Sequence, residues 1–235
     1  CLDVGSNGGF YSLLSRSLGC SVLAVDGQPW CLTRLSSSAA MNGFTTNFQT
    51  RATAVSDQKD LTIDVGSNKC SGLWAVVESD WINKESASIT TVKSTPLMEL
   101  VEQWILADDV ISMFKIDAEG SEMAIIKSAL PLFRSGRIHN VLVEIAPARA
   151  EKILPWNGVG GNGRGIEYVL EELYAANYTF TTSMLIGKVG AMSLETMKDI
   201  MGPVLPPPVL VGNETAIPRV QRRRGAPDLY RIFQI

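Results

Sequence analysis

The feature that most constrains this chain is a glycine-containing turn between a buried strand and a helix near its beginning. Residues 2–4 (LDV) are strand-like, and residues 10–18 (FYSLLSRSL) place leucines at helical spacing. Between them, Gly5 and Gly9 allow a tight turn and a close approach to a ligand, because glycine lacks a Cβ and tolerates positive φ. The helix start also directs backbone N–H groups toward such a ligand. The turn therefore predicts a nucleotide-like ligand at the carboxyl ends of parallel strands.

Further along, strand-like and helix-like segments alternate, which predicts βαβ units and a parallel sheet with helices around it. The last residues (LYRIFQI) alternate apolar and polar side chains and predict a final strand. The 235 residues suit one α/β domain. The predicted strands after the first span 21–25, 48–55, 110–116, 140–145, 178–182 and 229–235, and the predicted helices after the first span 29–41, 96–106, 121–133 and 166–176.

Two segments break the alternation. Residues 58–94 are polar with scattered β-forming residues, and we expect a looped or hairpin excursion at the edge of the sheet. Residues 202–218 contain five prolines, a density that disfavours both a helix and an interior strand. We expect this second segment to be extended at the surface.

Composition excludes several classes of protein. With 21 basic and 24 acidic residues the net charge is −3, whereas non-specific nucleic-acid binding requires a basic surplus, so we expect no nucleic-acid partner. No apolar run approaches the roughly 18 residues of a membrane-spanning helix.

The sequence begins at Cys1 inside a predicted strand, so we expect upstream sequence to be missing, and with it any signal or anchor. The compartment stays open.

The four cysteines contain no CxxC pair and have no histidine cluster nearby. We therefore expect neither a zinc site nor a disulfide framework. Cys20, between a predicted helix and a predicted strand, is expected to behave as a small buried apolar residue.

Two acidic residues follow predicted strands. Asp26 ends the second strand, about twenty residues after the first turn, where an acid can accept hydrogen bonds from two ribose hydroxyls. Its alternative role is to cap the helix that begins at Pro29. Ser56 and Asp57 follow the third strand, where the carboxylate can accept from an adenine amino group or lie in a solvated turn.

These motifs differ from the dinucleotide-binding G-x-G-x-x-G pattern and resemble the nucleotide half of class I methyltransferases. Residues 114–122 (FKIDAEGSE) are similar to the K-x-D-x-E-G-x-E signature of FkbM-type methyltransferases, and the resemblance covers about residues 2–146. It implies a Rossmann-like, doubly wound, mostly parallel sheet of seven strands with an antiparallel last strand. It also implies S-adenosyl-L-methionine as methyl donor and a hydroxyl of a carbohydrate or other small molecule as acceptor. Residues 1–235 would then form one class I methyltransferase domain, truncated at its amino end.

Carried over by position, the resemblance implies separate residues for the ribose, the adenine, the methionine end and the reacting centre. Asp26 and Gly27 would hold the ribose, although the family more often has Glu-Pro after the second strand, and Ser56 and Asp57 would hold the adenine. Asp117 would face the reacting centre. The residues of the first turn would surround the methionine end of the cofactor: Asp3, Gly5, Ser6, Asn7, Gly9 and Phe10.

Methylation of a hydroxyl requires orientation and a base, because a neutral hydroxyl is a poor nucleophile. Asp117 and Glu119 lie two residues apart after the fourth strand, and either acid can be the base. We expect Lys115, beside them, to belong to the catalytic group, because a nearby lysine lowers the pKa that crowding of the carboxylates raises. Glu144, which ends the next strand, is a third candidate. Alternatively, Glu144 is a buried acid paired with Lys115, because buried charges need partners. The same acids could bind a divalent metal, but nothing in their spacing requires one, and we assign no metal ligands.

Acceptor recognition is expected in the variable segments, because binding residues concentrate on loops. Trp156, beside the glycine-rich loop 157–165, would stack on a sugar or cover the core. The run Arg222–Arg224 would clamp an anionic acceptor or remain a solvated face.

His139 precedes the fifth strand, at the end of the sheet opposite the ligand, and is predicted to be a surface residue.

Two other functions stay open from the sequence. One is a catalytically silent S-adenosylmethionine-binding or scaffold domain, because an intact cofactor motif does not establish turnover. The other is a nicotinamide-dependent oxidoreductase on a similar sheet, against which Asn7 at the middle glycine position argues.

Overall fold

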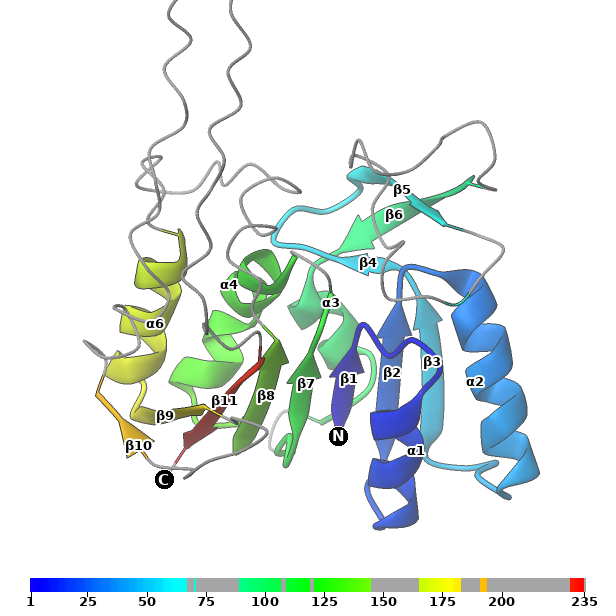
Figure 1. The fold of residues 1–235 in the computed structure, drawn as a ribbon, viewed down its shortest axis with the longest axis horizontal. Coiled ribbons are helices and arrows are strands. Elements are labelled where there is room, and N and C mark those ends of the chain that lie inside the picture. Colours follow the sequence, from blue (N-terminus) through cyan, green and yellow to red (C-terminus); the bar gives the residue numbers. More distant parts are fainter. Residues whose placement is uncertain are drawn as a thin grey trace, which may run out of the picture.

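The computed structural model describes residues 1–66, 70, 89–106, 109–118, 121–144, 165–182, 191–193 and 229–234. Within them, eight strands form a central sheet in the order β10-β9-β11-β8-β7-β1-β2-β3, and three more form a small sheet in the order β4-β6-β5 (Figure 1). The strands are β1 (Leu2–Val4), β2 (Val22–Asp26), β3 (Phe48–Ala52), β4 (Ala54–Val55), β5 (Thr62–Gly66), β6 (Ile89–Thr95), β7 (Phe114–Ile116), β8 (Asn140–Glu144), β9 (Tyr178–Thr182), β10 (Ala191–Met192) and β11 (Leu229–Gln234). The helices are α1 (Phe10–Ser17), α2 (Pro29–Met41), α3 (Leu97–Glu102), α4 (Glu122–Arg134) and α6 (Gly165–Ala175).

The centre of the main sheet is parallel. The five adjoining strands β3, β2, β1, β7 and β8 all run the same way, with Val4 opposite both Val25 and Ile116. The last strand, β11, is antiparallel to both β8 and β9, as predicted. The predicted count of seven strands is not met, because the two-residue strand β10 adds an eighth at the edge beside β9.

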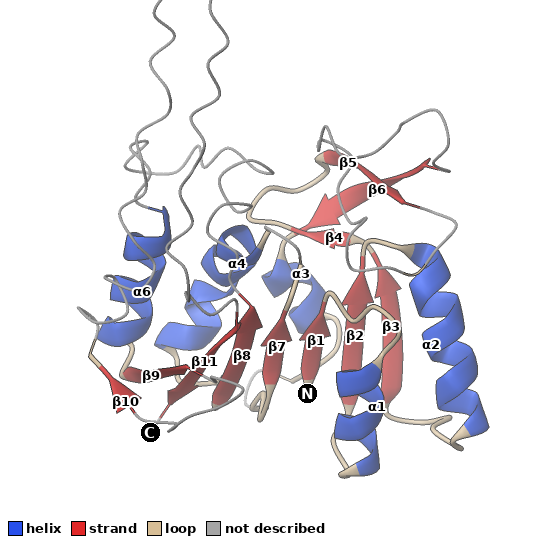
Figure 2. Cartoon of the chain, in the orientation of Figure 1, coloured by secondary structure: helices blue, strands red, loops and turns tan. Residues whose placement is uncertain are grey.

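Helices cover both faces of the sheet, as a doubly wound fold requires (Figure 2). One face packs alternate residues of β1, β2, β7 and β8, including Val4 and Ile116, against α3, α4 and α6. On the other face, Val22 and Ala24 of β2 pack against α2, with α1 alongside. Burying an aliphatic side chain in this way contributes about 1.5–3 kcal/mol. Side chains on both faces of the sheet are therefore buried against helices, and the carboxyl ends of the strands remain available for a site.

The third predicted strand, 48–55, is divided between the two sheets. β3 ends at Ala52, and β4 leaves the main sheet to pair with β6. The division occurs at Thr53, whose hydroxyl donates a 2.7 Å hydrogen bond to the carbonyl oxygen of Lys93 in β6. This contact comes from a segment forty residues away, so the local sequence does not reveal it.

The excursion predicted near 58–94 contains β5 and β6, which form an antiparallel hairpin pairing in the described residues. With β4 they make a small sheet that lies over the carboxyl ends of β1, β2 and β3, rather than extending the main sheet at its edge (Figure 1). This placement makes the small sheet a roof for whatever binds at those strand ends.

Two disulfides, Cys1–Cys20 and Cys31–Cys70, contradict the expectation of unpaired cysteines. Cys1 and Cys20 precede β1 and β2, and the parallel pairing of these strands places the two Cα atoms 5.8 Å apart. Cys70 reaches α2 from beyond the end of β5. Because both pairs depend on contacts between distant segments, a search for closely spaced cysteines does not find them. Cys20 is therefore half of a cross-link and not an isolated thiol.

Several sequence predictions lie outside the described residues. These are Glu119, Trp156, the loop 157–164, the proline-rich segment 202–218 and the run Arg222–Arg224. In the described parts of the chain, no helix combines the length and the apolar character that crossing a membrane requires.

Candidate functional site

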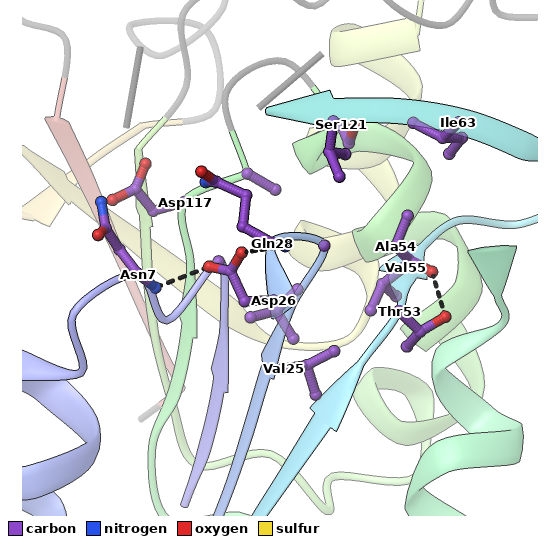
Figure 3. Close-up of a pocket in the computed structure, with 15 residues that line it drawn as sticks. Asn7, Val25, Asp26, Gln28, Thr53, Ala54, Val55, Ile63, Asp117 and Ser121 are labelled. Atoms are coloured by element: carbon purple, nitrogen blue, oxygen red, sulfur yellow. Dashed lines mark hydrogen bonds between the residues drawn. The ribbon is translucent and has the colours of Figure 1, made fainter. Parts of the chain in front are cut away.

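A pocket opens at the carboxyl ends of β1 and β2, beneath the small sheet (Figure 3). It holds about 680 Å³ of empty space, counted out to its open mouth. Its walls come from the turns after β1 and β2, from β4 and β5, and from the segment after β7. The lining residues are Val4, Gly5, Asn7, Val25, Asp26, Gly27, Gln28, Thr53, Ala54, Val55, Ile63, Val65, Asp117, Ala118 and Ser121.

The turn after β1 requires glycine at two positions. Gly5 and Gly9 have φ angles of 77° and 89°, which side chains rarely adopt. A Cβ on Gly5 would lie 1.8 Å from the carbonyl oxygen of Asp117, and one on Gly9 would lie 2.0 Å from Cδ1 of Leu35. The glycines therefore let the turn pass directly between the end of β7 and helix α2.

Asp26 is a buried carboxylate in the pocket wall, 6% exposed. Its Oδ2 accepts a 2.7 Å hydrogen bond from the backbone N–H of Asn7, and its Oδ1 accepts one of 2.7 Å from the N–H of Gln28 (Figure 3). Burial raises the pKa of Asp26, and these two hydrogen bonds oppose the rise by favouring the charged form. Each oxygen retains a further lone pair for a ligand hydroxyl. The N-cap position of α2 is Gln28, which makes no side-chain capping hydrogen bond, and Asp26 lies two residues before it.

Lys115 forms the second charged centre. Its buried ammonium group donates a 2.6 Å hydrogen bond to the carbonyl oxygen of Gly5. It also lies 3.3 Å from Oδ2 of Asp117 and 3.5 Å from Oδ1 of Asp3. The nitrogen is 5.7 Å from the ring centroid of Tyr11 in α1. Of the two acids, Asp117 reaches the pocket, with 34% of its side chain exposed, whereas Asp3 is buried below the turn.

Four predicted cofactor residues of the first turn do not line the pocket: Asp3, Ser6, Gly9 and Phe10. Asp3 accepts a 2.6 Å hydrogen bond from the hydroxyl of Ser12, which fastens α1 to β1. The Ser6 N–H donates to the carbonyl of Val25 and so shapes the turn. Phe10 is 72% exposed and packs edge-to-face on Tyr11. These residues build the turn or face outward, whereas Gly5 and Asn7 face the ligand space.

Ser56 and Asp57, predicted to hold an adenine, also lie outside the pocket lining. Ser56 is buried, and Oδ2 of Asp57 forms a 2.6 Å ion pair with Lys127 of α4. Because the chain bends away at Thr53, both residues follow the small sheet rather than the tip of β3. The pocket wall on this side is instead formed by Thr53, Ala54 and Val55.

Of the other two predicted catalytic acids, Glu144 lies among the described residues and Glu119 does not. Glu144 ends β8, which pairs with β7 so that Val143 lies opposite Ile116 and Glu144 is next to the tip that carries Asp117. The ammonium group of Lys115, the alternative partner of Glu144, contacts Asp3 and Asp117. His139 is exposed, as predicted. Among the described residues, no group of three or more His, Cys, Asp or Glu side chains is close enough to hold a metal ion.

The sequence interpretation missed the roof of the pocket. Ile63 and Val65 of β5 line it, and Gln28 and Ser121 complete the wall. Ile63 lies on the side of the pocket away from Asn7 and Asp117 (Figure 3). The signal for β5 was the short alternation in residues 62–66 (TIDVG), where Ile and Val occupy every second position. Periodicity predicts such a strand but not the sheet face it will cover.

Comparison with known proteins identifies the family. A family model described as the methyltransferase FkbM domain matches residues 3–179. The crystal structure of a methyltransferase FkbM from Methylobacillus flagellatus KT aligns at 14% identity with a TM-score of 0.44, over 72% of this chain and 36% of that one. The chain thus spans about a third of the length of that protein, and no curated protein sequence matches significantly. Since the family model covers most of the chain, the chain belongs to the FkbM methyltransferase domain family.

Proposed function

We propose that this chain binds S-adenosyl-L-methionine in the pocket at the ends of β1 and β2 and transfers its methyl group to a hydroxyl. The observation that carries the proposal is the Asp26 carboxylate, which is buried in the pocket wall and held by two backbone N–H groups. An acid so placed is suited to accept hydrogen bonds from the two hydroxyls of a ribose. Membership of the methyltransferase family supports the same chemistry.

The rest of the pocket suits an adenosine with a charged tail. Val55, Ile63 and Val65 offer apolar surfaces for a planar base. Gly5 and Asp117, at the other side, would hold the methionine end, where the Asp117 carboxylate complements positive charge. When bound, S-adenosylmethionine supplies a methyl group already activated on a sulfonium, so the protein's own task is to bind, orient and deprotonate.

The acceptor in this proposal is a carbohydrate or another small hydroxylated molecule. Its hydroxyl must be held in line with the methyl group and must lose its proton, and a carboxylate beside the pocket can take that proton. Asp117 is our first candidate for this base because it lines the pocket and is partly exposed. Glu144, on the next strand tip, and Glu119, two residues further along the chain, remain the other candidates.

Calorimetric titration with S-adenosylhomocysteine tests the cofactor half of the proposal. The wild-type chain should bind, and Asp26→Ala should bind at least about tenfold more weakly, because the ribose hydroxyls lose a charged acceptor. Asp64→Ala is the matched control, since Asp64 is an exposed acid on β5 that lies outside the pocket lining. Absence of binding by the wild-type chain, or equal loss in both variants, would contradict the proposal.

Transfer of an isotopically labelled methyl group to a panel of glycans and phenols tests the second half. Labelled product would establish turnover, and product stable to mild base would identify an ether rather than an ester. Cofactor binding without transfer to any acceptor would favour the catalytically silent domain. Binding of NAD by the wild-type chain, without binding of S-adenosylhomocysteine, would favour the oxidoreductase.

A further inference from the structure

The Cys31–Cys70 disulfide connects two opposing walls of the pocket. Cys31 lies in the first turn of α2, shortly after the lining residues Gly27 and Gln28. Cys70 follows β5, the strand that supplies Ile63 and Val65 to the roof. We propose that this disulfide is a positioning element for cofactor binding, whose reduction lowers the affinity of the pocket for the nucleoside. The inference rests on the function proposed above.

The disulfide also contacts the residue that holds Asp26. The side-chain oxygen of Asn7 lies 2.7 Å from Sγ of Cys70 and 3.9 Å from Sγ of Cys31. The backbone N–H of the same asparagine donates to Oδ2 of Asp26, and its φ of 48° lies in the left-handed region that most residues avoid. The disulfide therefore lies against the residue whose backbone N–H holds the ribose-binding carboxylate.

The pairing of the small sheet shows why a covalent tie matters at this place. Within the described strands, β5 is at the edge and pairs with β6 alone. β6 is anchored to β4 at one end, where Ser94 and Thr95 lie opposite Ala54 and Val55. The last pair of β5, Gly66 with Ile89, is at the other end of the hairpin, and the disulfide follows it. The bond thus holds the end of the roof that the sheet itself does not anchor.

The second disulfide provides an internal control. Cys1–Cys20 joins the amino ends of β1 and β2, at the edge of the main sheet opposite the pocket. None of the four cysteines lines the pocket itself, but Cys31 and Cys70 contact the lining residue Asn7. Both disulfides close loops of comparable length, 19 and 39 residues apart in sequence, so both should stabilise the fold. They differ in position, because Cys31–Cys70 lies against a residue of the pocket lining and Cys1–Cys20 joins the opposite ends of the strands.

The chemical step is a reversible two-electron exchange. A dithiol reductant transfers two electrons and two protons, the bond between Cys31 and Cys70 breaks, two thiols form, and the dithiol becomes its own cyclic disulfide. Disulfides persist where the compartment is oxidising. The test therefore uses protein produced in the bacterial periplasm, with the pairing of all four cysteines established by peptide mass spectrometry.

The experiment compares three forms by calorimetry with S-adenosylhomocysteine and by thermal unfolding. These are the oxidised wild-type chain, the Cys31→Ser/Cys70→Ser variant and the Cys1→Ser/Cys20→Ser variant. We expect the first double variant to bind at least about fivefold more weakly, and the second to bind within about twofold of wild type, although both melt at lower temperature. A purely stabilising role would lower the melting temperature of both and the affinity of neither.

If the Cys31→Ser/Cys70→Ser variant does not fold, the folded Cys1→Ser/Cys20→Ser variant, which keeps the Cys31–Cys70 bond alone, is titrated with dithiothreitol. Its affinity is followed while circular dichroism monitors the fold. Loss of affinity that returns on reoxidation supports the proposal. Unchanged affinity after verified reduction, equal loss in both double variants, or absence of the Cys31–Cys70 bond in the periplasmic protein overturns it. No binding to the oxidised wild-type chain would instead contradict the proposed function.

Discussion

The ammonium group of Lys115 donates a 2.6 Å hydrogen bond to the carbonyl oxygen of Gly5 and so joins the end of β7 to the turn after β1. The same nitrogen lies 3.3 Å from the carboxylate of Asp117, which lines the pocket. Lys115 itself is buried and absent from the pocket lining. The sequence predicts a catalytic role for Lys115, and we propose from its contacts that it acts by positioning Asp117 against the glycine turn.

Replacing this lysine should destabilise the fold. Lys115→Met leaves the buried carboxylate of Asp3 without its cation, and breaking a buried pair costs about 3–5 kcal/mol. Urea unfolding measures this loss. Lys59→Met, which removes an exposed partner of Glu99, should leave the unfolding midpoint nearly unchanged. Equal midpoints for the two variants would show that the buried network around Lys115 contributes nothing to stability.

Gly5→Ala should be far more damaging than Gly8→Ala. The new Cβ at position 5 would meet the carbonyl oxygen of Asp117 at 1.8 Å in a left-handed conformation, whereas at position 8 nothing lies within 4 Å. We expect Gly5→Ala to lose about 3 kcal/mol or more of unfolding free energy through strain and overpacking, and Gly8→Ala to lose little. Thermal unfolding of the two variants makes the comparison, and similar melting temperatures would refute the close approach of β1 and β7.

Asp117→Asn should reduce turnover more than cofactor affinity. Removing a general base lowers the rate about 10²–10⁴-fold. Loss of the carboxylate charge that faces the methionine end should weaken cofactor binding by only about tenfold. Initial rates with an acceptor from the methyl-transfer panel, beside calorimetry with S-adenosylhomocysteine, separate the two effects. Glu144→Gln is the parallel variant. A normal rate for Asp117→Asn would move the base to Glu144 or Glu119.

Affinity for S-adenosylhomocysteine should fall on acidification. Burial raises the pKa of Asp26 above its ordinary 3.8, so its carboxylate becomes protonated at a higher pH than an exposed aspartate would. Ribose hydroxyls bind the charged form better, so binding is full above the raised pKa and weakens as the pH falls through it. Calorimetry as a function of pH measures the effect. Asp26→Asn should bind weakly at every pH, and a wild-type-like acid dependence in that variant would exclude Asp26 as its source.

Local patterns in the sequence predicted the elements that form the floor of the site. The apolar strand before Gly5, the helix that begins at Pro29 and the acid at the end of β2 are all where periodicity and turn chemistry place them. Helix α2 spans Pro29–Met41, the predicted range, because proline suits a first helical position. Strand β9 likewise matches the predicted bounds. Each of these features is determined within about fifteen residues of sequence.

The roof and the cross-links escaped prediction because they depend on long-range pairing. β4 leaves the main sheet because Thr53 bonds to Lys93, and Cys31 meets Cys70 because β5 folds back over the strand ends. Asp57 follows a strand, as its predicted role requires, but its carboxylate pairs with Lys127 and it is absent from the pocket lining. Strand ends are recognisable in a sequence, but the element that covers them is not.

A crystal structure of the chain grown with S-adenosylhomocysteine tests the central claim most directly. The account predicts the nucleoside in the pocket beneath the small sheet, with both ribose hydroxyls within hydrogen-bonding distance of the Asp26 carboxylate. A nucleoside bound elsewhere, or bound here with its ribose turned away from Asp26, would contradict it.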